Sequence, residues 1–184
     1  HEVRDCLYRD EVFIVALTIV DLVQFLVFNI IYLLIAFSLA GLSFNYFGVF
    51  YVWQLLCLLT IQSYFQLFAA AGRNTSDATT KAMPCLILFL LFNGFFVTKA
   101  TVVVWMKWAI YISPLFYFIQ QVAVALFEDG TDKSDPSYLD SGQYVVDYYR
   151  FEDMAPVAVT VFVSQIVLFR VLQVMFLKFM NNFE

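Results

Sequence analysis

Charged residues are scarce in this sequence of 184 residues. Asp, Glu, Lys and Arg make up 14% of it, whereas ordinary soluble domains hold about 25%. The ten bases form no stripe of the kind that binds nucleic acid, so we expect no nucleic-acid partner. The phosphate-cradling Walker A loop is absent as well, because none of the six glycines precedes a lysine. This stretch of chain therefore cannot bind ATP by that route.

Cysteine and histidine are also rare. The three cysteines are Cys6 near the start and Cys57 and Cys85 within apolar runs, so we expect no disulfide. The only histidine is His1, and we expect no metal site. Proteolysis inside a membrane needs a Ser/His pair, two membrane aspartates or metal ligands, which argues against catalysis by this chain. The sequence begins without Met or a signal-peptide pattern, and we expect it to be a piece of a longer protein.

Apolar residues, in contrast, make up 62% of the chain, and phenylalanine alone occurs 22 times. A soluble domain of this size cannot bury so much apolar surface, so a lipid bilayer is the expected solvent. Four apolar runs approach the ~20 residues that a membrane-spanning helix needs. The expected fold is all-α and membrane-embedded, with spanning helices over residues 12–40, 46–72, 82–97 and 155–179.

The connections between these helices differ in charge. The tight turn over 41–45 carries no base, and residues 128–153 hold eight acids. The two ends and the polar turn over 73–81 carry Arg4, Arg9, Arg73, Lys81 and Lys178. The positive-inside rule therefore places both ends and the polar turn in the cytosol and the acidic loop outside, with the plasma membrane as the expected location. Pro84 suits the first turn of the third helix.

Residues 98–127 are too few for a full crossing and return, which takes about 40 apolar residues, yet they are too apolar for water. We therefore predict a re-entrant helical hairpin that enters the outer leaflet and leaves on the same side. The expected interface anchors are Trp105, Trp108, Tyr111, Pro114 and Tyr117. Lys99 and Lys107 can reach the headgroups. The break near Pro114 should be covered by other helices or line water.

Several motifs in fixed order resemble one transporter family. They are Asn93-Gly94-Phe95-Phe96, then Trp105, Trp108, Tyr111, Pro114 and Tyr117 at steps of three, then Phe127-Glu128, and finally Ser141-Gly142-Gln143-Tyr144-Val145-Val146. At the start, His1-Glu2 and Tyr8-Arg9 precede an acid at Asp21. Together these motifs resemble the G-subfamily ABC transporters, of the white/brown and pleiotropic-drug-resistance type.

The resemblance implies that this chain is the C-terminal part of an ABC-2 type transmembrane domain, namely family helices three to six with the re-entrant hairpin and a structured external loop. It also implies that two earlier membrane helices and a nucleotide-binding domain, which binds ATP and Mg, lie elsewhere in the parent protein. The implied partners are that domain, a second transmembrane domain and the lipid bilayer. The implied activity is outward, alternating-access transport of lipidic or amphipathic compounds.

The resemblance assigns roles to several residues. Phe95 and Phe96 would form a hydrophobic plug above a dimeric cavity, although ordinary packed or lipid-facing phenylalanine is an equal alternative. Met83, Ile87 and Leu90 lie one turn apart and would face the cavity, where a plain helix-packing stripe is the alternative. The coupling segment 1–11 would contact the ATPase through Glu2, Arg4 and Arg9, which otherwise form a solvated charge run. The loop over 128–153 would be a lid or a solubilising loop.

Asp21 and Arg170 are the charges inside predicted spans. A charge at a helix centre costs about 2.5–3.5 kcal/mol on insertion scales. Asp21 follows Val12 by nine residues and Arg170 precedes Phe179 by nine, which places each roughly 14 Å from the inner boundary. We therefore predict an intramembrane ion pair. The alternative is a protonated Asp21 beside an Arg170 that extends to the headgroups.

Two functions other than export stay open from the sequence. A channel needs a filter of carbonyls or charges, and a phenylalanine constriction suits a closed plug better. A membrane scaffold without ATP-driven transport is the second alternative.

Overall fold

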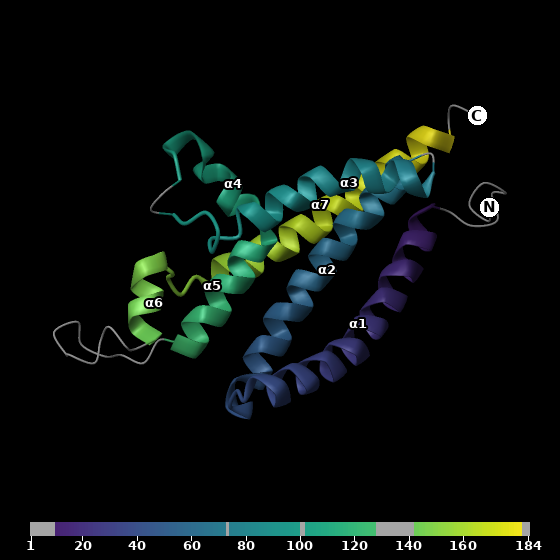
Figure 1. The fold of residues 1–184 in the computed structure, drawn as a ribbon. Helices are drawn as coiled ribbons and strands as arrows, with labels where there is room; N and C mark the ends of the chain where they lie inside the picture. Colours follow the sequence, from purple (N-terminus) through teal and green to yellow (C-terminus); the bar gives the residue numbers. More distant parts are fainter. Residues whose placement is uncertain (1–9, 73, 100–101, 128–141, 182–184) are drawn as a thin grey trace.

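The computed structural model describes residues 10–72, 74–99, 102–127 and 142–181. Within these ranges the protein is all-helical, without strands (Figure 1), which confirms the predicted fold class. The elements are α1 (Asp10–Ala40), the 3-10 helix η1 (Phe44–Tyr46), α2 (Phe47–Ala71), α3 (Thr75–Leu91), the 3-10 helix η2 (Val104–Met106), α4 (Lys107–Ile112), α5 (Pro114–Phe127), α6 (Gly142–Tyr149) and α7 (Ala155–Asn181).

Among the described residues, three single helical stretches are long and apolar enough to cross a membrane. They are Ile14–Ala40 in α1, Phe44–Ala71 in η1 and α2, and Ala155–Lys178 in α7. Only 17% of the most apolar window of each is buried inside the protein. Most of their apolar side chains therefore face outward, as they do when lipid covers them rather than water. The protein is a multi-pass membrane protein.

α3 differs from the predicted third helix over 82–97, since it runs over Thr75–Leu91. The segment 75–81, predicted as a polar turn, is helical. Asp77 lies in the first helical turn, where the helix dipole favours an acid, and its Oδ2 lies 2.7 Å from Lys81 Nζ one turn later. Pro84 consequently lies inside the helix and not in its first turn. α3 has 17 residues and a polar start, so it is not among the three spanning stretches.

The helices run back and forth between two ends of the molecule (Figure 1). The start of α1, the connection between α2 and α3, and the end of α7 lie at one end. The η1 turn, α4 and α6 lie toward the other end, at the left of Figure 1. α2 is central, since it contacts α1, α3, α5 and α7. The basic segments that follow α2 and end α7 thus share one end, as the charge pattern predicts.

A Schellman-type turn fixes the hairpin of α1 and α2. Gly41 has φ +66°, a conformation that side chains disfavour, and the N–H of Leu42 donates to the carbonyl of Phe37 at 3.3 Å. The Phe37 ring is buried and meets the Phe50 ring edge-on at 5.1 Å. This turn and its aromatic contacts set α1 antiparallel to α2 without a charged residue.

The core lies where α5 packs against α2 and α7. Phe116, Tyr117 and Phe162 are buried, and the Tyr117 and Phe162 rings meet edge-on at 6.3 Å. Trp53 of α2 meets the same Phe162 ring at 6.4 Å. Burying large aromatic side chains contributes strongly to stability. α5 is therefore anchored in the body of the protein.

Candidate functional site

A polar cluster joins three helices within the apolar spans. Asp21 of α1 and Arg170 of α7 lie close together, with 3.7 Å between Asp21 Oδ2 and Arg170 NH2. Gln66 of α2 bridges them, because its Nε2 donates to Asp21 Oδ2 and its Oε1 accepts from Arg170 NH1. Gln173, one turn after Arg170, accepts a second bond from NH1 at 3.1 Å. Both charged side chains are mostly buried.

This cluster explains how the two charges are tolerated in an apolar region. Buried charges are stable only when they are paired and their remaining hydrogen-bonding groups have partners. Gln66 and Gln173 supply such partners to Asp21 Oδ2 and to Arg170 NH1, whereas Arg170 Nε is buried without a hydrogen-bond partner. Sequence reasoning missed both glutamines, although each is a polar residue inside a predicted apolar helix. The cluster fixes α1, α2 and α7 relative to one another at one level.

The segment after α3 presents two aromatic rings at the surface. Asn93 Oδ1 accepts hydrogen bonds from the N–H groups of Phe95 at 2.9 Å and Phe96 at 3.2 Å. Gly94 has φ +84°, and a Cβ there would lie 2.6 Å from Cδ2 of the buried Phe116. Only glycine fits this turn without strain or collision. The turn therefore stops α3 and turns the chain so that Phe95 and Phe96 are 53% and 70% exposed.

The two exposed rings are ordered by aromatic contacts. Phe95 and Phe96 meet edge-on, with ring centroids 5.7 Å apart. Phe95 also stacks on Tyr149 of α6 at 5.4 Å. Tyr149 stacks in turn on Phe151 at 5.4 Å, and Phe151 is buried. α6 lies within the predicted external loop, so this loop supports the predicted plug residues directly. Sequence reasoning missed the role of Tyr149.

The predicted hairpin is a bent pair of helices, with 80° between η2–α4 and α5. The break between them is covered by protein. Ser113 is buried and its Oγ donates to the carbonyl of Phe89 in α3 at 2.9 Å. Gln165 of α7 donates to the carbonyl of Ile112 at 2.6 Å. These bonds confirm the expectation that other helices cover the break near Pro114.

The five predicted interface anchors lie in two different environments. Trp105, Trp108 and Tyr111 are exposed, as interface anchors must be. Pro114 and Tyr117 are buried, and the Tyr117 hydroxyl donates to the carbonyl of Tyr111 at 3.1 Å. Pro114 and Tyr117 therefore pack in the core and do not reach headgroups, because α5 turns inward at the break.

The predicted cavity residues share one exposed face of α3. Met83, Ile87 and Leu90 are all exposed, and their spacing of four and three residues places them on one side of the helix. α3 is joined to α2 by Tyr64, whose hydroxyl donates to the carbonyl of Ala82 at 2.6 Å. The predicted coupling residues Glu2, Arg4 and Arg9, and most of the loop 128–153, lie outside the described residues.

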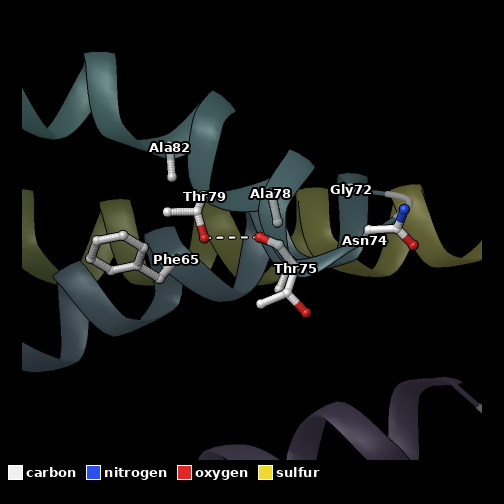
Figure 2. Close-up of a pocket in the computed structure, with 8 residues that line it drawn as sticks. Phe65, Gly72, Asn74, Thr75, Ala78, Thr79 and Ala82 are labelled. Carbon is white, nitrogen blue, oxygen red and sulfur yellow. Dashed lines mark hydrogen bonds between the residues drawn. The ribbon is translucent and has the colours of Figure 1, made fainter.

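A cleft of about 500 Å³ opens beside the connection between α2 and α3 (Figure 2). None of its lining residues is charged, and all except one phenylalanine are small: Phe65, Ala69, Gly72, Asn74, Thr75, Ala78, Thr79 and Ala82. A Cβ at Gly72 would lie 2.8 Å from the Cβ of Ala78, so the backbone just after α2 lies close to the start of α3. Thr79 Oγ1 donates to the carbonyl of Thr75 at 2.8 Å (Figure 2). Sequence reasoning did not predict this cleft.

Comparisons with known proteins identify the family. The family described as ABC-2 type transporter matches residues 1–127. Protein white of Drosophila melanogaster is 34% identical over 117 residues, which cover 61% of this chain and 17% of that protein. The pleiotropic ABC efflux transporter of multiple drugs of Saccharomyces cerevisiae is 31% identical over 104 residues, which cover 54% of this chain and 6% of that protein.

The chain thus spans less than a fifth of the length of these relatives. The family match covers well over half of this chain, and it includes α1 to α5 with the Gly94 turn and the bent helix pair. The resemblance seen in the sequence is confirmed: the chain belongs to the ABC-2 type transporter family, and its relatives are white and pleiotropic-drug-resistance ABC transporters of the G subfamily.

Proposed function

We propose that this chain is the membrane-spanning part of an ATP-driven exporter of lipidic or amphipathic compounds. The family and its efflux relatives support transport of drugs or lipids. The feature that carries the proposal is the turn at Gly94, which leaves Phe95 and Phe96 at the surface. Two adjacent exposed rings that one turn holds in place, outside the spanning helices, suit a closure formed with a second copy.

The substrate cavity in this proposal lies between two transmembrane domains. Met83, Ile87 and Leu90 form its wall on this side, because they are apolar and exposed on one face of α3. Phe95 and Phe96 follow the same helix and close the cavity at its end. Apolar walls and an aromatic plug accept amphipathic compounds and exclude water and ions. The second transmembrane domain is either another copy or a homologous half of one chain.

The energy in this proposal comes from ATP and Mg bound by a nucleotide-binding domain of the parent protein. Among the described residues no group of three or more His, Cys, Asp or Glu could hold a metal ion. We propose that Glu2, Arg4 and Arg9 contact the nucleotide-binding domain, and that the cleft beside Gly72 extends this contact surface. The end of α2 and the start of α3, which line the cleft, lie at the same end of the molecule as the start of α1 (Figure 1).

We propose that the protein lies in the plasma membrane and that this end of the molecule faces the cytosol. The basic residues Lys81 and Lys178 lie toward that end, in α3 and α7. Cytoplasmic connections carry an excess of such bases. The hairpin and α6 then lie in the outer leaflet and above it.

The test is transport by the parent transporter, containing this chain, in proteoliposomes. Wild-type protein should accumulate an amphipathic dye in inside-out vesicles only with ATP. Phe95→Ala and Phe96→Ala should each raise the ATP-independent leak of the dye, because the plug loses an aromatic ring. Phe28→Ala, which removes an equally exposed ring from α1, should leave the leak unchanged.

Other outcomes identify the alternative functions. Dye flux or ion conductance in wild-type protein without ATP would favour a channel. No flux under any condition, with intact and correctly inserted protein, would favour a scaffold. Either result would overturn the proposal that the protein is an exporter.

A further inference from the structure

A small basic pocket lies beside α4 and the end of α6. It has a volume of about 200 Å³. Since a water molecule occupies about 30 Å³ in the liquid, the pocket has room for a group of several heavy atoms. Its lining comes from three separate segments: Lys99, Lys107, Ile110, Tyr111, Arg150 and Glu152.

Lys99 is held in place by the protein. Its Nζ donates to the carbonyl of Arg150 at 3.3 Å and lies 4.9 Å from the centre of the Phe116 ring. The side chain is half-buried. An ammonium group has three donors, and one is used by the carbonyl, so two are left for a ligand. Lys99 is therefore a fixed positive group in the pocket wall.

Arg150 is placed by an unusual backbone conformation. It has φ +54°, a left-handed value that costs an L-residue other than glycine roughly 1–2 kcal/mol. The conformation is held because the N–H of Phe151 donates to the carbonyl of Val146 at 2.9 Å and the Phe151 ring is buried. A glycine would satisfy this turn without strain. The protein nevertheless carries an exposed arginine here, at the rim of the pocket.

The charges of the pocket do not balance. Lys99, Lys107 and Arg150 face it with three positive charges, and Glu152 supplies one negative charge. In the described ranges no ion pair joins any of these three bases to a carboxylate. Three bases on one small pocket repel one another, and an anion relieves that repulsion. The geometry and the charge both favour a compact anion with several acceptor oxygens.

We propose that this pocket binds a phosphate group, and that the phosphate belongs to a phospholipid of the adjacent leaflet. Lysine and arginine donors are the usual partners of phosphate oxygens. The exposed Trp105 and Trp108 lie in η2 and α4 beside the pocket, and tryptophan is enriched at headgroup level. The bound headgroup ties α4 to the end of α6. This inference does not depend on the direction or the substrate of transport.

The test is native mass spectrometry of the parent transporter that contains this chain, released from a non-ionic detergent. It is titrated separately with a phosphatidylglycerol, with the diacylglycerol of the same acyl chains, and with inorganic phosphate. Phosphatidylglycerol should bind one site that the diacylglycerol, which lacks phosphate, does not fill. Lys107→Gln and Arg150→Gln should each weaken this binding about fivefold, whereas Lys178→Gln, at the far end of α7, should not.

Removing the acid provides a test in the opposite direction. Glu152→Gln should tighten binding, because the only acid among the described residues that line the pocket disappears while the backbone carbonyl of residue 152 stays in place. Tighter binding is also hard to obtain from a misfolded variant. Thermal unfolding of each variant confirms that it is folded.

The outcomes separate the sources of the phosphate. Binding of phosphatidylglycerol well above inorganic phosphate supports the lipid headgroup, and equal binding supports the phosphate site but assigns it to a soluble anion. No phosphate-dependent binding, or binding that Lys107→Gln, Arg150→Gln and Glu152→Gln leave unchanged, overturns the proposal. Transport by the same variants is measured separately, so failure of the exporter proposal does not affect this result.

Discussion

The ring of Phe95 stacks on the ring of Tyr149, with centroids 5.4 Å apart and planes inclined by 17°. Phe95 belongs to the turn after α3 and Tyr149 ends α6. The pair therefore joins the proposed plug to a helix of the proposed external loop. A change in that loop can reach the plug through one aromatic contact, without a movement of the spanning helices.

Replacing Tyr149 should loosen the plug. Tyr149→Leu removes the stacking on Phe95 and on Phe151, and aromatic pairs contribute about 0.5–1.5 kcal/mol beyond the area they bury. We expect a faster ATP-independent dye leak in proteoliposomes and a lower thermal unfolding temperature. The matched control is Tyr144→Leu on the same helix, because the ring contact of Tyr144 is with Tyr148 and not with Phe95. Equal leaks in the two variants would show that Phe95 holds its place without Tyr149.

Replacing Gly94 should destabilise the turn for two reasons. Gly94→Ala places a side chain at φ +84°, and its Cβ would lie 2.6 Å from Phe116 Cδ2. The backbone strain costs roughly 1–2 kcal/mol, and overpacking adds about 1–3 kcal/mol. Gly41→Ala is the matched control, because Gly41 has φ +66° with no atom within 4 Å of the added Cβ.

Thermal unfolding in detergent measures both glycine variants. Gly94→Ala should lower the unfolding temperature more than Gly41→Ala, and the difference reports the collision with Phe116. If the two variants are equally stable, Phe116 does not hold the turn against the core. A further substitution, Phe116→Leu combined with Gly94→Ala, should recover part of the loss by making room for the methyl group.

The polar cluster should behave as a unit when it is mutated. Asp21→Asn leaves Arg170 without its acid, and breaking a buried pair costs about 3–5 kcal/mol. Arg170→Gln leaves Asp21 without its base in the same way. The double variant should recover much of the loss, because no uncompensated charge stays behind. The readout is the yield of monodisperse protein on gel filtration, and additive losses would show that the two charges do not interact.

A buried and an exposed polar contact should differ in their contribution to the yield of folded protein. Gln66→Leu should also lower the yield, because it removes the bridge between Asp21 and Arg170. Lys81→Gln breaks the exposed pair with Asp77 and should cost only a few tenths of a kcal/mol. A loss from Lys81→Gln as large as that from Gln66→Leu would mean that burial of the cluster does not decide its contribution.

The parts of the fold that follow from composition could be predicted from the sequence. Long apolar runs predict α1, α2 and α7 because a bilayer stabilises any apolar helix that is long enough to cross it. The meeting of Asp21 and Arg170 follows from the same regularity, since helix rise alone sets their depth. The bent pair after residue 98 follows from chain length, because too few residues remain for two crossings.

The parts that depend on which particular side chains contact one another could not be predicted. Gln66 hardly lowers the hydropathy of α2, so its role appears only when Asp21 and Arg170 flank it. The start of α3 was missed because polar residues suit an exposed helical turn as well as a loop, and the Asp77–Lys81 contact decides between them. The burial of Tyr117 depends on Phe162, which belongs to another helix.

Lys99 should titrate below an ordinary lysine. Burial lowers the pKa of its ammonium from the ordinary value of 10.5, and the charge of Glu152 raises the pKa in partial opposition. Between the lowered pKa and 10.5, Lys99 is protonated more in the unfolded chain than in the folded chain. Its contribution to the free energy of unfolding therefore rises with pH across that window. After ¹³C-dimethylation of the lysines, the NMR signal of Lys99 should titrate at a lower pH than the signals of the other lysines. The signal is assigned by its loss in Lys99→Gln. Glu152→Gln should lower the pKa further, and a saturating phosphate ligand should raise it. A Lys99 pKa at or above 10.5 in the free protein would contradict the half-buried position of this side chain.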